Sequence, residues 1–235
     1  DRTAFTSDSG RFGIREIAVG PHVIHVRRLG FTPLDQKITV RAGITDTLRI
    51  ELARVAVSLG RITVKAWPPC GTPGAPRATA DSALAAIVEQ IKLNAEQYRF
   101  LAEQYPFEYE AMIIRSSRLR KTGLVVGSPA IGERFTSKAT RGYKPGEVIY
   151  RRGWNWYFQI PTLSEVADRR FIERHCWHYG GTVTIEDEEM YRVDVVADDR
   201  LKGADVNGSF FVNARTFQIQ RSILHLSRRS SQFKD

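Results

Sequence analysis

The segment 175–179 (HCWHY) concentrates side chains that could bind a metal ion or act as a nucleophile. Imidazole and thiolate are good ligands for zinc or copper, and a neighbouring histidine could stabilise a Cys176 thiolate. On a strand, however, successive residues point to opposite faces, so at most two of these ligands lie together. A disulfide from Cys176 to Cys70, the only other cysteine, explains the same residues without a metal. We therefore predict this disulfide, although in cytosol both would be free thiols.

The remaining candidates for chemistry are weaker. His22 and His25 (HVIH) lack a carboxylate and would point to opposite faces of a strand, so a zinc site there is not expected. The acidic run 186–189 (EDEE) lacks the alternating oxygen ligands and the central glycine of a calcium loop, and we interpret it as a solvated hairpin turn. No nucleophile elbow, phosphate-binding loop or dinucleotide fingerprint occurs. We predict no catalytic residue, no metal and no cofactor.

A basic and aromatic segment, residues 138–156, has several interpretations. Such a mixture can bind single-stranded nucleic acid, sit at an anionic membrane surface, or anchor a protein interface. Ordinary strand patterning is a further interpretation. Nucleic acid would be scarce outside the cytoplasm, where the resemblance given below implies that the protein lies, and we do not expect it as a partner. We predict a docking surface formed by Tyr143, Lys144, Tyr150, Arg151, Arg152, Trp154 and Trp156.

The elements that must position these residues fall into two parts of the 235-residue chain. Residues 3–65 alternate polar and apolar side chains in short runs separated by glycines, which predicts β-strands only. Residues 67–79 (WPPCGTPGAPRAT) contain four prolines and two glycines, which is typical of a linker. We expect a β-sandwich over 1–66, the linker, and an α+β domain over 80–235.

Within the second domain, apolar residues recur every 3.6 positions from Leu84 to Tyr105, which predicts a helix over 81–105 with Asp81 or Thr79 as its cap. From Phe107 onward, polar and apolar residues alternate again, which predicts strands. Thr162 and Glu165 form a T-x-x-E capping box that should open a shorter helix through Phe171. An antiparallel meander is expected last, with strands near 182–186, 189–197, 207–213 and 216–226 and a turn at 213–216.

The stretch from Thr6 to Val64 resembles the carboxypeptidase regulatory-like domain, a transthyretin-like β-sandwich. The resemblance rests on the D-x-G-x-F turn at 8–12, the Gly20-Pro21 turn, the Gly30-Phe31 corner and the closing strand 59–64. It implies secretion, partner binding and structural support, and no peptidase activity. The family usually opens with further strands that do not precede Asp1, so we expect an incomplete sandwich with an exposed sheet edge. The second domain is similar at pattern level to α+β regions of bacterial envelope proteins.

Charge and resemblance together suggest a function. The chain carries 35 basic and 26 acidic side chains, and residues 121–174 are strongly basic, with 10 against 5. No run of apolar residues is long enough to span a bilayer. The sequence therefore favours a non-enzymatic, membrane-extrinsic scaffold or accessory subunit of the periplasm or cell envelope. It would bind a membrane protein complex, such as a photosynthetic or respiratory assembly, or other copies. A periplasmic carrier of lipid or another apolar ligand is the alternative, and an enzyme is the third hypothesis.

Overall fold

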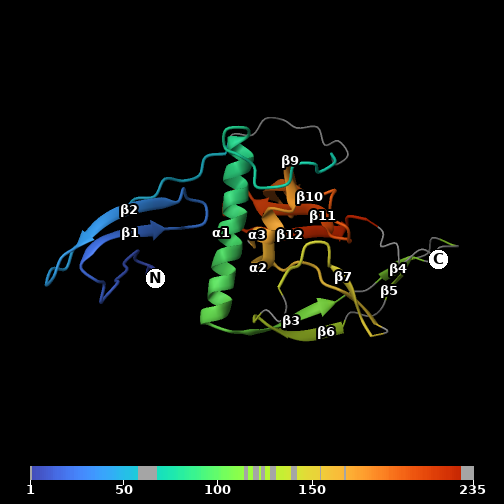
Figure 1. Ribbon diagram of the computed structural model, residues 1–235, viewed down its shortest axis with the longest axis horizontal. Coiled ribbons are helices and arrows are strands. Elements are labelled where there is room, and N and C mark those ends of the chain that lie inside the picture. Colours follow the sequence, from blue (N-terminus) through green and yellow to red (C-terminus); the bar gives the residue numbers. More distant parts are fainter. Residues whose placement is uncertain are drawn as a thin grey trace. The chain divides into compact units, whose positions relative to one another are not determined.

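The computed structural model of the protein describes residues 2–57, 68–113, 116–118, 122, 125–127, 131–138, 142–153, 155–166 and 168–228. The chain is mainly β with few helices, as predicted, and forms two compact units, Asp1–Ala56 and Val57–Asp235 (Figure 1). The predicted boundary at residue 66 lies about ten residues later. None of the helices described is both long and apolar enough to cross a bilayer.

The first unit contains one β-hairpin. Strands β1 (Gly20–Val26) and β2 (Leu34–Val40) pair antiparallel, and their side chains alternate strictly between half-buried and exposed. A single bridge joins Phe31 to Arg54, flanked by backbone hydrogen bonds at Thr32 and Val55. The predicted sandwich is not seen in the described residues. Residues 3–65 were expected to form short strands throughout, but 3–6, 8–14 and 46–52 have no strand structure, and the expected closing strand at 59–64 lies outside the described residues.

The second unit is built on a four-stranded antiparallel sheet of order β12-β11-β10-β9. Its strands are β9 (His175–Ile185), β10 (Glu188–Ala197), β11 (Val206–Asn213) and β12 (Ile219–Leu226). The predicted meander is confirmed, with two differences. Strand β9 begins seven residues before the expected 182, which places the whole HCWHY segment in the sheet. Strand β12 begins three residues after the expected 216, because Phe217 takes a left-handed conformation with φ 59°.

A 23-residue helix covers this sheet. Helix α1 (Ser82–Gln104) begins where Asp81 accepts a hydrogen bond from the Leu84 amide at 2.9 Å, which selects Asp81 over Thr79 as the cap. Its buried side chains include Leu84, Ile87, Val88, Ile91 and Ala95, and Figure 1 shows it running beside the sheet. Asn94 accepts a hydrogen bond from the backbone of Ile219 at 3.2 Å, which fixes the helix against β12.

Three two-stranded ribbons and two short helices complete the second unit. The ribbons pair β3 (Glu108–Ile113) with β6 (Ile131–Thr136), β4 (Ser116–Arg118) with β5 (Val125–Gly127), and β7 (Ile149–Arg152) with β8 (Asn155–Phe158). The predicted single helix after the capping box is instead split into α2 (Leu163–Val166) and α3 (Arg169–Ile172). The split follows from Asp168, which caps α3 by accepting from the Arg170 amide at 2.8 Å.

The Pro/Gly segment predicted as a linker is attached to the second unit over residues 68–79. Cys70 is fully buried, and its carbonyl accepts a hydrogen bond from the Asp199 amide at 3.2 Å. The Gly74 amide donates to the carbonyl of His175 at 2.9 Å. The prolines exclude helix and central strand here, as expected. Backbone hydrogen bonds nevertheless attach the segment to the first residue of β9 and to Asp199.

Candidate functional site

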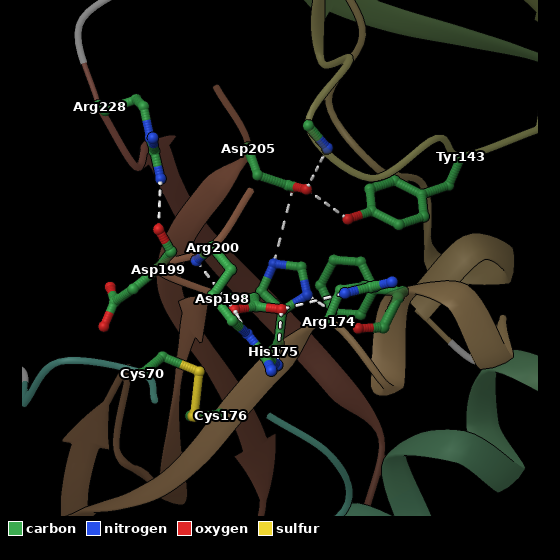
Figure 2. A network of polar contacts seen from close by, with 12 residues as sticks. Cys70, Tyr143, Arg174, His175, Cys176, Asp198, Asp199, Arg200, Asp205 and Arg228 are labelled. Atoms are coloured by element: carbon green, nitrogen blue, oxygen red, sulfur yellow. Dashed lines mark hydrogen bonds and ion pairs between the residues drawn. A yellow bond between two sulfur atoms is a disulfide. The ribbon is translucent and has the colours of Figure 1, made fainter. Parts of the chain in front are cut away.

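The predicted disulfide is confirmed. Cys70 and Cys176 are bonded, with their Cα atoms 5.5 Å apart, across 106 residues of sequence. The bond joins the Pro/Gly segment to the second residue of strand β9 (Figure 2). Because both sulfurs are in the bond, Cys176 has no thiolate with which to act as a nucleophile or metal ligand. This disulfide favours an oxidising compartment.

A buried carboxylate, Asp205, organises the polar network beside the disulfide (Figure 2). One of its oxygens accepts hydrogen bonds from the Tyr143 hydroxyl at 2.6 Å and the Gly146 amide at 2.7 Å, and the other accepts from the Val206 amide at 2.8 Å. Burial and the adjacent Asp205 charge raise the pKa of Tyr143 well above its usual range, so the hydroxyl keeps its proton and donates it. The loop 142–148 is thereby attached to the start of β11.

His175 lies next to this carboxylate and is also fully buried. Its ring nitrogens are 2.8 Å from the carbonyl oxygen of Phe171 and 3.1 Å from that of Val206, while Nε2 is 3.7 Å from Asp205. The ring stacks on Phe171 at 4.0 Å between centroids. Burial lowers the pKa of His175, and the charge of Asp205 opposes that shift. The imidazole therefore links α3, β9 and β11 rather than facing solvent.

Asp198 forms a second buried ionic cluster at the end of β10. Its carboxylate accepts from the Arg200 guanidinium at 2.9 and 3.1 Å and from Arg174 at 3.2 Å. These hydrogen bonds, led by the one from Arg200, lower the pKa of Asp198 to about 2. The carboxylate stays ionised at neutral pH and is fully compensated. Both clusters thus stabilise the strand ends next to the disulfide.

A third polar group lies on the face of the sheet opposite to His175. Asp194 accepts from Ser209 at 2.5 Å and from Arg192 at 2.8 Å, and His178 lies opposite Asp194 in the β9–β10 register. A side chain at Gly180 would collide with Arg192 and Asp194, so glycine makes room for this pair. The order His, Asp, Ser resembles a catalytic triad in composition only. Here serine donates to aspartate, whereas a triad needs histidine between them.

These networks have little access to a substrate. His175, Asp198 and Asp205 are fully buried, and their polar atoms bond to other groups of the chain. A cavity of about 10 Å³ beside Tyr143 and Glu165 has room for about one water molecule. One Glu165 oxygen is buried there without a hydrogen-bond partner, and such a water would satisfy it. The arrangement supports stabilisation of the fold more directly than chemistry on a ligand.

Of the predicted docking residues, the structure describes the side chains of Tyr143, Lys144 and Tyr150, and the β7–β8 register pairs the backbone of Arg151 with that of Trp156. Tyr143 is 2% exposed and bonded to Asp205, so its side chain is in the core and unavailable to a partner. Lys144 is exposed and pairs with Glu147 at 3.7 Å, and Tyr150 is half-buried. Trp154 lies outside the described residues, as do the side chains of Arg151, Arg152 and Trp156. The surface they would form stays a prediction.

The weaker sequence candidates have ordinary structural roles. His22 and His25 lie on opposite faces of β1. A ring nitrogen of His22 is hydrogen-bonded to the carbonyl of Ala18 at 2.8 Å, and His25 pairs with Asp35 at 3.0 Å. The acidic run forms the tight turn between β9 and β10, with Glu186 and Asp187 both at positive φ. In the part of the chain that the structure describes, no three side chains of His, Cys, Asp or Glu lie close enough together to hold a metal ion.

Sequence reasoning did not find Asp194, Asp198 or Asp205. One signal was present, since Asp194 and Asp205 interrupt apolar strands (RVDVVA and ADVNGSFFV), where a charge must be paired if buried. Their partners are distant in sequence and could not be named. No protein family, curated protein or solved structure was found to match the chain. The resemblance of the first unit to carboxypeptidase regulatory-like domains therefore stays a prediction.

Proposed function

We propose that the protein is a non-enzymatic scaffold or accessory subunit of the cell envelope, which docks onto a membrane protein complex or onto other copies. The observation that carries this proposal is the lack of a buried core in the described residues of the first unit. Among its described residues 2–57, no side chain is buried. A two-stranded hairpin is marginally stable by itself in water and needs further strands or a packed face.

The hairpin offers a partner two kinds of contact. Its half-buried face carries the apolar residues Ile24, Val26, Leu34, Ile38 and Val40 beside His22 and Gln36. Excluding water from the apolar residues would stabilise a complex. Neither outer edge of the hairpin pairs with another strand in the described residues. Such an edge presents backbone donors and acceptors for strand addition, which makes little demand on the partner's side chains.

The alternative functions have less support. A lipid carrier surrounds its ligand with a largely apolar cavity of several hundred Å³. The hollow beside Tyr143 holds about 10 Å³, and the one of about 810 Å³ on the β1–β2 hairpin is open to solvent and includes His22, His25 and Lys37 in its lining. An enzyme needs reactive groups that a substrate can reach, whereas His175, Asp198 and Asp205 are fully buried and bonded to other groups of the chain. The disulfide favours an oxidising compartment and so agrees with an envelope location.

Site-specific photo-crosslinking in cells tests the proposal. Photoreactive residues placed singly at Ile24, on the half-buried face of β1, and at Val23, which is 45% exposed on the other face, test both sides of the hairpin. At least one of them should give a discrete crosslink to an envelope protein or to another copy. The matched control is the same residue at Ile223 on β12, with 49% exposure. If neither position gives a product beyond that of Ile223 while the protein is folded and exported, docking through the first unit is refuted.

A further inference from the structure

The cavity beside Tyr143 contains a carboxylate that is only partly bonded. Glu165, which is 6% exposed, lines this cavity of about 10 Å³. Its Oε2 accepts hydrogen bonds from the amide of Thr162 at 2.8 Å and from the hydroxyl of Thr162 at 3.0 Å. Its Oε1 is buried and has no hydrogen-bond partner in the described part of the chain. Because a buried charged oxygen without a partner is unfavourable, the cavity should hold an atom that bonds to Oε1.

The charge of Glu165 is also not balanced by a direct ion pair among the described residues. Lys144 lines the same cavity, but its Nζ lies 3.7 Å from Glu147, which is a second carboxylate of the lining. Arg170 interacts with the charge of Glu165, but its guanidinium is bonded to Asp168 at 2.6 Å. The lining therefore carries two carboxylates and one ammonium group, and its net charge is negative.

Other side chains of the lining supply neutral oxygen atoms. Gln159 has an amide oxygen, and the Tyr143 hydroxyl gives its proton to Asp205 and keeps its lone pairs (Figure 2). Carboxylate, amide and hydroxyl oxygens are the ligands that hard cations prefer. A calcium ion would need roughly six to eight oxygens, usually with several carboxylates. The described residues place no three acidic, histidine or cysteine side chains together, so a singly charged ion fits this lining better.

From this combination we infer that the cavity binds a monovalent cation of about the size of a water molecule, such as potassium or ammonium. The cation would bond to Oε1 of Glu165, as water would, and would also neutralise its charge, which water cannot do. It would connect α2 to the loop 143–148 and to Gln159. The lining includes no residue of the first unit, so this inference and the proposed function can fail separately.

The test is urea unfolding of the full chain, followed by tryptophan fluorescence, in chloride salts of potassium, ammonium and tetramethylammonium at equal ionic strength. Tetramethylammonium has the same charge but is too large for a cavity of about 10 Å³. With a Kd of about 10 mM, potassium or ammonium at about 0.1 M would raise the folding equilibrium constant roughly tenfold. The urea midpoint should then rise by roughly 0.7 M. Equal midpoints in the three salts would overturn the inference and assign the cavity to water.

Two variants locate the effect. Glu165→Gln can keep an oxygen on Thr162 and turn its amide N–H groups towards the cavity, which suits water but repels a cation. This variant should have the same midpoint in all three salts. The matched control is Glu173→Gln, because Glu173 pairs with Arg169 and does not line the cavity. The control should keep the full effect of potassium or ammonium. A salt effect that both variants keep, or that both lose, would contradict a site at Glu165.

A direct measurement covers the case in which Glu165→Gln does not fold. Rubidium has the charge of potassium and scatters X-rays anomalously. Wild-type crystals soaked in rubidium chloride should show one anomalous peak next to Oε1 of Glu165. A wild-type crystal without this peak would overturn the inference, even if the urea midpoint depends on potassium.

Discussion

Removing the disulfide should cost the second unit a large part of its stability. The bond closes 106 residues, and the chain-entropy relation for a loop of that length gives about 5 kcal/mol at 25 °C. Domains are typically stable by about 5–15 kcal/mol, so the loss is a third or more of the total. With a urea dependence of about 2 kcal/mol per molar, the unfolding midpoint should fall by roughly 2.5 M.

The assay is urea unfolding of the Cys70→Ala, Cys176→Ala double variant against the oxidised wild type. Trp177, which is 5% exposed, reports on unfolding of this unit through its fluorescence. The reduced wild type is the control for packing, because it lacks the crosslink but keeps both sulfurs. Reduced wild type and double variant should lie close together, well below the oxidised protein. A midpoint of the double variant within about 0.5 M of the oxidised protein would refute the crosslink argument.

Two further predictions concern the buried carboxylates. Asp205→Asn should destabilise the second unit by about 3 kcal/mol, because an amide cannot accept from Tyr143, Gly146 and Val206 at once; Asp199→Asn, at an exposed neighbour, should stay within about 0.5 kcal/mol in the same urea assay. Asp198 should make the unit sensitive to acid. Its folded pKa of about 2 is below the unfolded value of 3.8, so its contribution is present above about pH 4 and is lost as pH falls towards 2. Between about pH 5 and pH 3, the urea midpoint of the wild type should therefore decrease more than that of Asp198→Asn. An equal decrease in the two proteins would contradict this role of Asp198.

Sequence patterns predicted those helices and strands whose formation depends mainly on residues close together in the chain. Helix α1 follows from its 3.6-residue period, the Asp81 cap and Pro106, and three strands of the meander from alternation and turn residues. The disulfide followed from a count of two cysteines. The first unit shows the limit of this approach. The alternation of polar and apolar residues in 3–65 shows which segments could form strands. A strand also needs a partner with which to pair, and in the described residues of this unit only β1 and β2 pair as strands.

The candidate site was missed for a related reason. Tyr143 appeared to belong to a basic surface because its neighbours in sequence are charged, yet Asp205, 62 residues away, holds it in the core. Aromatic composition alone does not distinguish a docking ring from a buried one, since tyrosine suits both environments. The stacking of Tyr109 on Phe135 could not be predicted either, because these rings become neighbours only through strand pairing.

The disulfide also determines how the protein would transmit force. A pull applied between the first unit and the C-terminal strands reaches Cys70, crosses to Cys176 through the sulfurs, and continues along β9. Helix α1 and the ribbons lie in the closed loop and carry no tension. Reduction would place that loop in series with the load and add up to roughly 350 Å of extensible chain. Under load, the oxidised form would therefore be a short tether and the reduced form a long one.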